Sequence, residues 1–387
     1  MSDKLHVLVI PNWLPSKRDK ITGTYHHTFC RALCASERVK VNMLYVDPQG
    51  MKTAYKYPFM KKSYTNEYGD YKLYARRMLD YSRFAYDAYI KAYTKKLDRL
   101  FCKYVKRFGK PDVIHAQVLL SAGYAASVVG KKYGVPVVIT EHASYFESFL
   151  SGKKEKYARF ACENARITCV GNYMNGILKE KYGYNSETLP NIVDTSVFFE
   201  NEKAPSDPQL LNLVTVAALS MPKHIDDTVR ALRLLRDRGE IGDFKFTVVG
   251  VGIMGDYYKS VVDELGMNDV VEFVGQKSPS EVAEYLSKSD MLIIASVIET
   301  FGIPAIEALA AGVPVVCTRC RGPEGFLDES CAEFCNPADP EDLARAIKTM
   351  CDRKDGFDVE YLRSRARAFS SESVADRAIN IYKELMK

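Results

Sequence analysis

Short apolar stretches of strand length alternate with helical patterns along the whole chain, and this alternation constrains the fold more than any other feature. In the first half the expected strands are His6–Ile10, Val39–Val46, Asp112–Ala116, Val135–Thr140 and Ile167–Val170. In the second half they are Leu211–Leu219, Phe244–Gly250, Val270–Gly275, Met291–Ser296 and Val313–Thr318. Val, Ile and Leu runs separated by helices of about 10 to 15 residues are typical of a parallel sheet covered on both faces. The pattern predicts an α/β protein with two doubly wound, Rossmann-like domains.

The length of 387 residues fits this two-domain prediction. The stretch Glu200–Gln209 is polar, contains two prolines and lacks apolar periodicity, so it is the best linker candidate. We expect a first domain over 1–199, a linker over 200–210 and a second domain over 211–370, with a C-terminal helix at about 371–387 free to pack back on the first. In doubly wound sheets ligands bind beyond the carboxyl ends of the strands, so functional residues are expected in those loops.

Positive charge is concentrated in one part of the first domain. The segment from Lys52 to Lys110 holds sixteen Lys or Arg and five Asp or Glu, whereas the whole chain carries only +5. Its long helix is expected over Ser82–Phe108. One side of this helix is a stripe of aromatic residues that we expect to pack in the core, and the outer side is basic. Tyrosines among cations are typical of a segment that binds an anionic membrane surface. The alternative interpretation is a solvated helix face with no ligand. The charge would suit nucleic acid as well, but we expect no nucleic-acid partner.

Composition and apolar runs exclude several protein classes. Hydrophobic residues make up 47% and charged residues 27%, which is ordinary globular usage and argues against a disordered or fibrous chain. The longest apolar runs are far shorter than the ~20 residues of a membrane helix, and the first residues do not resemble a secretory signal. We therefore expect a cytoplasmic protein, which the basic segment allows to bind peripherally at the inner face of the membrane.

The ten cysteines are expected to be reduced thiols. One group, Cys317, Cys320, Cys331 and Cys335, has nearly the spacing of a four-thiolate zinc site. Because Cys317 and Cys335 end apolar, strand-like runs, small core residues are the preferred interpretation. We expect no metal site and no cofactor.

The most literal motif match is Gly250-x-Gly252-x-x-Gly255 after the strand Phe244–Val249, with Glu272 following. A dinucleotide site needs such glycines for a tight turn and an acidic residue about 20 positions later for the ribose. Glu272 falls inside a strand-like run, however, and the motif does not open the chain. Nicotinamide or flavin binding is therefore a minor alternative.

A more specific feature runs from Glu299 to Val316. Here a strand ends, a turn carries Glu299, and a helix opens near Pro304, which suits the first helical position. The free N–H groups around Phe301, Gly302 and Ile303 would then face any anion at the helix start. Glu307, one turn into the helix, could accept hydrogen bonds from a ribose diol. The alternative is two carboxylates stabilised by the helix dipole.

This segment resembles the E-x7-E motif of retaining glycosyltransferases of the GT-B fold, specifically the large family-four group, and the resemblance covers nearly the whole chain. Further resembling segments are Pro111 to Ala116 of a "PDxxHxH" region, Ile139 to His142, Leu189 to Asp194 of a "PNGVD" turn, and Val249 to Gly252 of a "GxG" turn. Gln117 replaces the second histidine of the first segment, and Ile192 replaces the glycine of the third.

The resemblance implies a role for each matching residue. It places Gly23 in a loop beside the donor phosphate, His142 next to the donor sugar, and Glu299 on the hydroxyls of the transferred sugar. The remaining implied ligands are the backbone of Phe301, Gly302 and Ile303 for sugar and phosphate, Glu307 for the ribose, Lys223 for the leaving diphosphate and Gln276 for the base.

The resemblance implies sugar transfer from a UDP- or GDP-sugar to an acceptor hydroxyl with retained configuration and without a metal. A lipid-linked glycan in cell-surface polysaccharide synthesis is the expected acceptor. One departure is that Ala217-Ala218 replaces the usual Gly-Arg, whose arginine is a second cation on the diphosphate. Arg319, Arg321 or Lys277 are candidate substitutes, and a catalytically degenerate partner protein is the alternative function.

Overall fold

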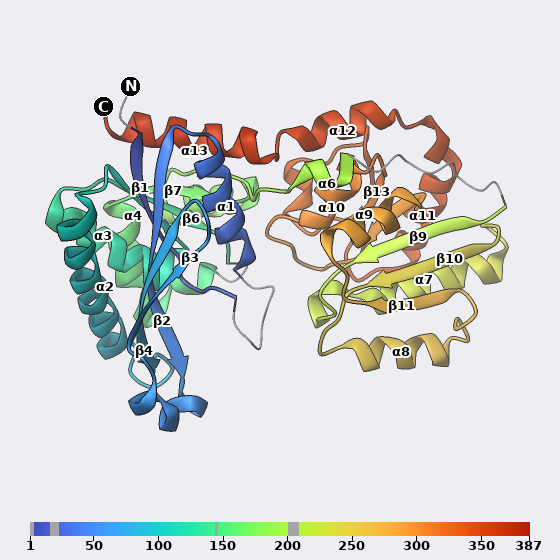
Figure 1. Cartoon of the computed structure of the whole chain (residues 1–387). Helices are drawn as coiled ribbons and strands as arrows, with labels where there is room; N and C mark the ends of the chain where they lie inside the picture. The colour runs from blue at the N-terminus through green and yellow to red at the C-terminus, as the bar shows by residue number, and fades with distance from the viewer. Residues whose placement is uncertain (1–3, 16–22, 144–145, 200–208) are drawn as a thin grey trace. The chain divides into compact units, whose positions relative to one another are not determined.

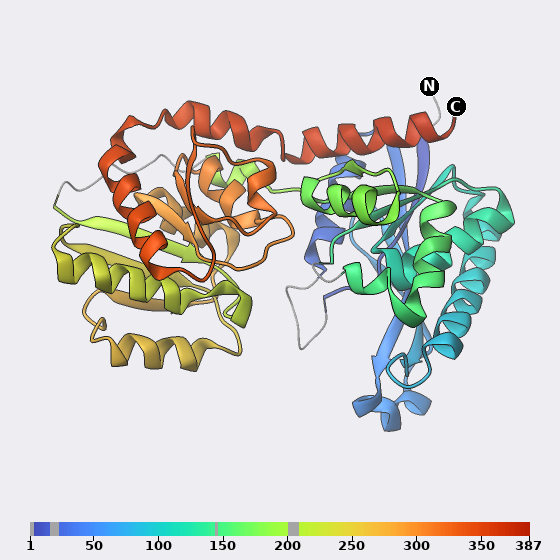
Figure 2. The same cartoon turned by 180° about the vertical axis from the view of Figure 1, so that it is seen from behind.

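The computed structural model of the chain describes residues 4–15, 23–143, 146–199 and 209–387 (Figures 1 and 2). The chain folds into two compact units, Met1–Ile192 with Ser371–Lys387, and Val193–Ser370. Each unit is an α/β body built on a mostly parallel sheet, so the predicted fold class is confirmed. The boundary falls at Ile192, ahead of the expected linker, most of which (200–208) lies outside the described residues.

The first unit contains a sheet of eight strands in the order β3-β4-β2-β1-β5-β6-β7-β8. Neighbouring strands are parallel except β3, which pairs antiparallel with β4. The strands are β1 (Leu5–Ile10), β2 (Val39–Gly50), β3 (Ser63–Glu67), β4 (Lys72–Asp80), β5 (Val113–Gln117), β6 (Val137–Glu141), β7 (Arg166–Cys169) and β8 (Glu187–Thr188). β1, β5 and β6 are almost wholly buried, because helices cover both faces of the central sheet.

The main helices of the first unit are α1 (Thr24–Ala35), α2 (Tyr86–Phe108), α3 (Tyr124–Tyr133), α4 (Glu155–Glu163), α5 (Asn172–Tyr182) and α13 (Ser371–Leu385). The C-terminal helix α13 belongs to the first unit, where it packs against α1 (Figure 1). Its Tyr382 hydroxyl lies 2.6 Å from Nδ1 of His115 on β5. This histidine, part of the "PDxxHxH" resemblance, is fully buried and also contacts Thr140 Oγ1 at 2.7 Å, so its observed role is structural.

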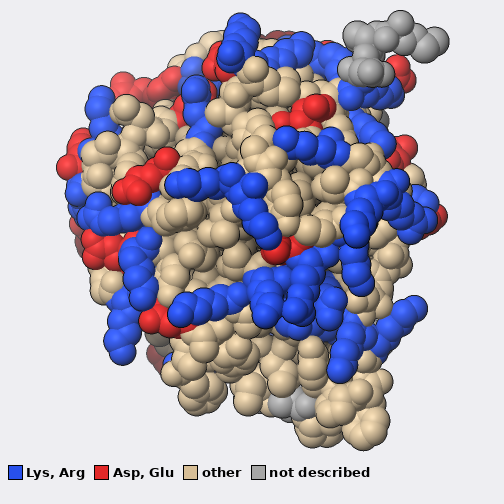
Figure 3. Space-filling model, turned by 90° about the vertical axis from the view of Figure 1, so that its left-hand side faces the viewer, with Lys and Arg blue, Asp and Glu red and all other residues tan. Residues whose placement is uncertain are grey.

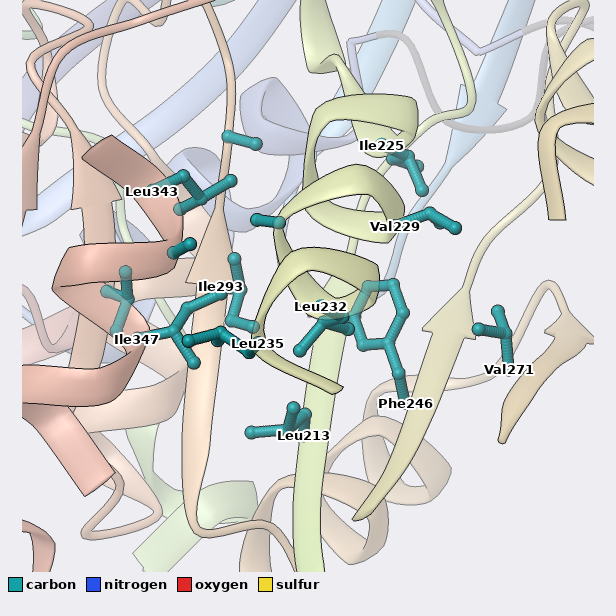
Figure 4. Close-up of a cluster of buried hydrophobic side chains, with 14 of the residues drawn as sticks. Leu213, Ile225, Val229, Leu232, Leu235, Phe246, Val271, Ile293, Leu343 and Ile347 are labelled. Atoms are coloured by element: carbon teal, nitrogen blue, oxygen red, sulfur yellow. The ribbon is translucent and has the colours of Figure 1, made fainter. Parts of the chain in front are cut away.

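The second unit contains a parallel six-stranded sheet in the order β11-β10-β9-β12-β13-β14. Its strands are β9 (Leu211–Val216), β10 (Phe244–Val249), β11 (Val271–Gly275), β12 (Met291–Ile294), β13 (Val315–Thr318) and β14 (Ala332–Cys335). Its helices are α6 (Thr195–Phe199), α7 (Ile225–Arg238), α8 (Gly255–Glu264), α9 (Pro279–Ser287), α10 (Ile303–Ala310), α11 (Pro340–Arg353) and α12 (Val359–Arg367). Figure 4 shows side chains of α7 and α11 packed with Leu213, Phe246 and Ile293 of the sheet.

All ten strands expected from the sequence are present, with shifted ends. Four others, β3, β4, β8 and β14, were not predicted. β3 has no fully buried residue, so it lacks the apolar run used to find strands. The expected helix from Ser82 begins at Tyr86, since residues 82–84 form a turn in which Ala85 N–H donates to Tyr81 O at 3.1 Å.

The four cysteines with zinc-like spacing are buried core residues. Within the described part of the chain, only His224, Asp226 and Asp227 bring three potential metal ligands within 4.8 Å of one another. The thiols of Cys317, Cys320, Cys331 and Cys335 therefore do not converge as a zinc site requires. None of the described helices combines the length and the apolar character needed to cross a bilayer.

Candidate active site

Two residues implied by the resemblance, Lys223 and Glu299, form an ion pair in the second unit. Lys223 ends a short helical turn after β9, and Glu299 lies in the loop after β12. Because β9 and β12 are neighbours, their carboxyl ends bring the two loops together. The Lys223 side chain is 22% exposed and that of Glu299 15%, so both remain accessible to a ligand.

Main-chain contacts hold Glu299 in place. Its N–H donates to Cys320 O at 2.8 Å and its carbonyl accepts from Gly322 N at 3.0 Å, which ties it to the loop after β13. The Ser296 hydroxyl donates to Glu299 Oε1 at 2.9 Å. A Cβ on Gly322 would lie 2.5 Å from the Phe301 nitrogen, so only glycine allows this loop to pass so closely.

The helix α10 begins directly after Glu299. Gly302 has φ of 94° at its N-cap, a left-handed conformation that favours glycine, and Pro304 occupies the first turn as expected. No described carbonyl accepts from the N–H groups of Phe301, Gly302 or Ile303. This helix start therefore offers unpaired donors and the positive end of a helix dipole beside the ion pair.

Glu307 lies one turn further along α10 and is half-buried. Burial raises the pKa of its carboxyl to about 7. Its carboxyl has no hydrogen-bond or ion-pair partner among the described residues. A group in this state can exchange hydrogen bonds with neutral hydroxyls, which is the chemistry expected of a ribose ligand.

The Gly250-x-Gly252 turn has a structural explanation in the second unit. A Cβ on Gly250 would lie 1.8 Å from the carbonyl oxygen of Ala217, and one on Gly252 would lie 2.2 Å from that of Leu219. Ala217 N–H donates to Val249 O and Leu219 N–H donates to Val251 O, so the two loops run side by side. The glycines permit this close packing, and the dinucleotide interpretation is unnecessary.

The candidate cations that could replace the missing arginine differ in their surroundings. Arg319 stacks over Phe334 and lies 3.9 Å from Glu324. Lys277 lies 3.6 Å from Glu281. Arg321 forms a parallel backbone bridge with Glu299, so its backbone lies next to one member of the ion pair. Gln276 is exposed after the edge strand β11, and the described contacts do not connect it to Lys223 or Glu299.

In the first unit, His142 follows β6 and Gly23 precedes α1. His142 Nε2 lies 2.6 Å from Gln117 Oε1, and the imidazole ring stacks on Tyr25 with centroids 4.4 Å apart. Burial lowers the pKa of His142 to about 3, so its imidazole is neutral at pH 7. Gly23 adopts φ of 85°, and a Cβ there would lie 2.9 Å from Trp13 O.

The loop around His142 is fixed by a buried carboxylate. Glu141 is 1% exposed and accepts hydrogen bonds from the backbone N–H groups of Leu119, His142 and Ala143 at 2.7 to 2.8 Å. Burial raises the pKa of Glu141 to about 7, and these backbone donors oppose the rise.

Tyr25 and Ser296, which lie beside the candidate residues, were not predicted from the sequence, and neither was the cluster of His224, Asp226 and Asp227. Tyr25 follows Gly23 by two positions, so the N-cap glycine was the available signal. In the cluster, His224 Nδ1 lies 2.8 Å from Asp227 Oδ2, while Asp226 accepts from the Tyr257 hydroxyl at 3.0 Å. These contacts already occupy several of the potential ligand atoms.

Comparisons with known proteins agree with these observations. Residues 22–197 match the family described as Glycosyltransferase Family 4, and residues 197–368 match Glycosyl transferases group 1. An uncharacterized glycosyltransferase of Methanocaldococcus jannaschii is 24% identical over 71% of this chain and 76% of its own length. A "GDP-mannose-dependent alpha-(1-6)-phosphatidylinositol dimannoside mannosyltransferase" of Mycobacterium tuberculosis is 27% identical over 64% of this chain and 67% of its own.

Among solved structures, Anabaena Alr3699/HepE in complex with UDP superposes with a TM-score of 0.72 at 16% identity, covering 98% of this chain and 100% of that one. At 16% sequence identity this similarity shows that the two proteins share a fold and shows nothing further. Both sequence families together span most of the chain, and the relatives are named glycosyltransferases. The chain is therefore a GT-B glycosyltransferase of the group 1, family 4 class.

Proposed function

We propose that the enzyme transfers a sugar from a UDP- or GDP-sugar to an acceptor hydroxyl with retention of the anomeric configuration. The observation that carries this proposal is the Lys223–Glu299 ion pair beside the start of α10. A relative named GDP-mannose-dependent and a structural neighbour that contains UDP support a nucleoside-diphosphate donor.

The chemistry follows from the charges at this site. The bond between the anomeric carbon and the diphosphate oxygen breaks, and Lys223 and the N–H groups of α10 stabilise the negative charge on the leaving diphosphate. The acceptor oxygen attacks from the same face, and its proton passes to a diphosphate oxygen. Glu299, freed from Lys223 when phosphate binds that amine, accepts hydrogen bonds from the hydroxyls of the transferred sugar.

The test is donor turnover by two variants of this pair. Glu299→Gln and Lys223→Ala should each lower kcat by about 10² or more, since each removes a group that stabilises the transition state. Lys245→Ala is the matched control, because Lys245 forms an exposed ion pair with Glu272 in the same unit. Wild-type turnover in both site variants would refute the assignment, and NMR of the anomeric proton of the product tests retention.

We further propose that catalysis needs no metal ion, since Lys223 and the helix start supply the positive charge. Turnover should persist after treatment with EDTA. A loss that is restored by added Mg²⁺ or Mn²⁺ would contradict this proposal and draw attention to His224, Asp226 and Asp227.

For the acceptor we propose a lipid-linked glycan, reached while the enzyme is bound peripherally to an anionic membrane. Large apolar side chains are exposed at one end of the first unit: Tyr55 and Phe59 on the 3-10 helix η1 (Met51–Phe59), and Phe84 in the turn before α2, at 69%, 90% and 80%. Gly50 and Asp80 pair at the ends of β2 and β4, so both segments leave from the same end of the sheet. Exposed aromatics beside many cations suit a lipid interface.

Vesicle sedimentation tests this membrane surface. The enzyme should sediment with vesicles of phosphatidylcholine and phosphatidylglycerol at low salt, and the double variant Phe59→Ser, Phe84→Ser should not. Ile253→Ser is the control, because Ile253 is 94% exposed in the second unit. If wild type stays in solution, or if the control loses binding equally, this membrane surface is wrong.

A further inference from the structure

A basic groove lies in the first unit between the β3–β4 hairpin and α2, and the proposed reaction does not use it. Its volume is about 390 Å³, within the range of small-molecule pockets. The groove is lined by Lys61, Ser63, Tyr64, Thr65, Tyr74, Ala75, Arg76, Leu100, Lys103, Tyr104, Arg107 and Phe108. β4 is four positions from β6 in the sheet, so at about 4.8 Å per strand the groove is roughly 19 Å from the strand that precedes His142.

Regular secondary structure builds this groove. Ser63 pairs with Arg76 and Thr65 pairs with Tyr74 in the antiparallel hairpin, so these four side chains share one face of the two strands. Opposite them, α2 contributes residues 100, 103, 104, 107 and 108, whose spacing of three and four places them on one side of the helix. The lining is thus set by the two elements and not by loops.

The charge of the groove is one-sided. Four of its lining residues are cations, namely Lys61, Arg76, Lys103 and Arg107, and none is acidic. In the described part of the chain none of these four forms an ion pair, whereas Lys72 and Arg77 of the same hairpin pair with Glu67 and Asp47. The surrounding surface of α2 is also basic, as Figure 3 shows for this side of the unit.

Nearby cations extend this uncompensated field. Burial lowers the pKa of Lys96 on α2, and the positive charges of Arg76, Arg99 and Lys62 lower it further. These cations repel one another and have no carboxylate partners among the described residues. Binding of an anion relieves this repulsion and so lowers the free energy of the surface.

Tyr104 and Phe108 form the aromatic floor of the groove, and neighbouring groups hold them in place. The Tyr104 hydroxyl lies 2.6 Å from His6 Nε2 and 2.9 Å from Asn42 Nδ2, and the Arg107 guanidinium lies 5.0 Å from the centre of the Phe108 ring. Arg77 Nη1 donates to the Lys61 carbonyl at 2.5 Å and so fixes the backbone of that lysine. Cationic side chains above fixed aromatic rings suit a ligand with an anionic group joined to a bulky organic part.

We propose that this groove binds a phosphate or pyrophosphate ester, with Lys61, Arg76, Lys103 and Arg107 on the phosphate oxygens and the aromatic floor against the organic part. The site is separate from the donor site and does not depend on the proposed transfer reaction. A lipid headgroup and a soluble phosphorylated sugar both present this chemistry.

The test is calorimetric titration of the 387-residue chain with inorganic pyrophosphate at low salt. Because Lys223 is proposed to bind a diphosphate as well, all proteins carry Lys223→Ala, so the donor site is weakened equally in every variant and differences between variants report on the groove. Arg76→Glu, Arg107→Glu should weaken binding by on the order of a hundredfold, since two attractive charges become repulsive. The neutral pair Arg76→Gln, Arg107→Gln should weaken it by about tenfold and guards against a folding defect.

The matched control is Lys91→Glu, Lys95→Glu, which makes the same charge change on exposed positions of α2 outside the groove. Its affinity should fall by less than about threefold. Equal losses in control and groove variants, or no loss in either groove variant, would overturn the proposal. Sedimentation with phosphatidylglycerol vesicles identifies the source: a lipid ligand predicts that the groove variants lose vesicle binding and the Lys91, Lys95 control does not, and a soluble ligand predicts that groove and control variants sediment alike.

Discussion

Arg321 is the candidate substitute for the missing arginine whose backbone pairs directly with that of Glu299. Its backbone pairs with that of Glu299 at the carboxyl ends of β12 and β13, and its N–H donates to Glu324 Oε2 at 2.5 Å. A cation here would lie in the loop next to the ion pair and the start of α10. Arg319, two residues earlier, has a side chain that is 56% exposed and stacked on Phe334.

We predict that Arg321→Ala raises the KM for the nucleotide-sugar donor by about 10- to 100-fold, because a charge-assisted contact to phosphate is lost. Arg319→Ala should change the KM by less than about threefold, as expected for an exposed side chain. Steady-state kinetics of both variants with the same donor provides the comparison. Equal effects would show that neither arginine replaces the missing cation specifically.

The resemblance located the two charged residues of the site but not the contact between them. Glu299 and Lys223 were identified by a resemblance, and the structure brings them together because β9 and β12 are neighbours. Their mutual ion pair was not predicted, since two residues that lie 76 positions apart in the sequence carry no information on side-chain contact. The stacking of Tyr25 on His142 was missed for the same reason.

The apolar runs predicted the parallel strands, but the β3–β4 hairpin was missed. β4 has buried Leu73, Ala75 and Met78 among polar neighbours, and the facing strand β3 is mostly exposed. A strand with one solvated face gives a weak signal next to the strong helical pattern of α2. This hairpin forms one wall of the basic groove, so the groove could not be foreseen either.

The glycines of the Gly250-x-Gly252-x-x-Gly255 turn should contribute unequally to stability, because only some of them lie against the backbone of the loop after β9. Gly250→Ala should destabilise the protein by about 2 to 4 kcal/mol, because its Cβ would overlap the Ala217 carbonyl at a positive φ. Gly255→Ala should change the free energy of unfolding by less than about 1 kcal/mol and towards stability, since Gly255 opens α8 and its Cβ meets only Leu219 at 3.6 Å.

Thermal unfolding followed by far-UV circular dichroism distinguishes these two glycine variants. If the glycines served a bound dinucleotide and not the packing of loops, both variants would unfold like wild type in the absence of ligand. A large loss in Gly255→Ala would show that the helix start is tighter than the structure indicates.

The two units differ in how their buried groups titrate. Five of the six histidines, namely His6, His26, His27, His115 and His142, belong to the first unit. Burial lowers the pKa of His115 and of His142 to about 3 and holds that of His26 well below its usual value. In the second unit the outstanding shift among carboxyls is in Glu307, whose pKa burial raises to about 7.

These shifts have opposite effects on stability. Between pH 6.5 and 3 the unfolded chain binds more protons at the three histidines than the folded chain does, so acid weakens the first unit. Glu141 opposes this between pH 7 and 4.5, because its folded form binds the proton more tightly, but among the large shifts it is one carboxyl against three histidines. Glu307 acts in the same direction as Glu141, so the same acidification strengthens the second unit.

We therefore predict that mild acid lowers the melting temperature of the first unit and does not lower that of the second. The only tryptophan, Trp13, lies in the first unit with its ring 6.4 Å from that of His26, so its fluorescence reports on this unit alone. A net excess of two histidines at up to about 1.4 kcal/mol per pH unit each gives a loss of about 2 to 3 kcal/mol between about pH 6.5 and 5.5. For a unit of this size, the Trp13 melting midpoint should fall by about 5 to 10 °C.

The measurement is thermal unfolding at about pH 7.5 and 5.5, followed by Trp13 fluorescence and by far-UV circular dichroism on the same samples. On acidification the fluorescence midpoint should fall, and the part of the dichroism transition that Trp13 does not report should not move to lower temperature. His115→Gln removes one titrating group while its amide can still bond Tyr382 or Thr140, so it should reduce the shift between the two pH values. A Trp13 midpoint that stays constant or rises on acidification would mean that Glu141, and not the buried histidines, dominates the proton balance of the first unit.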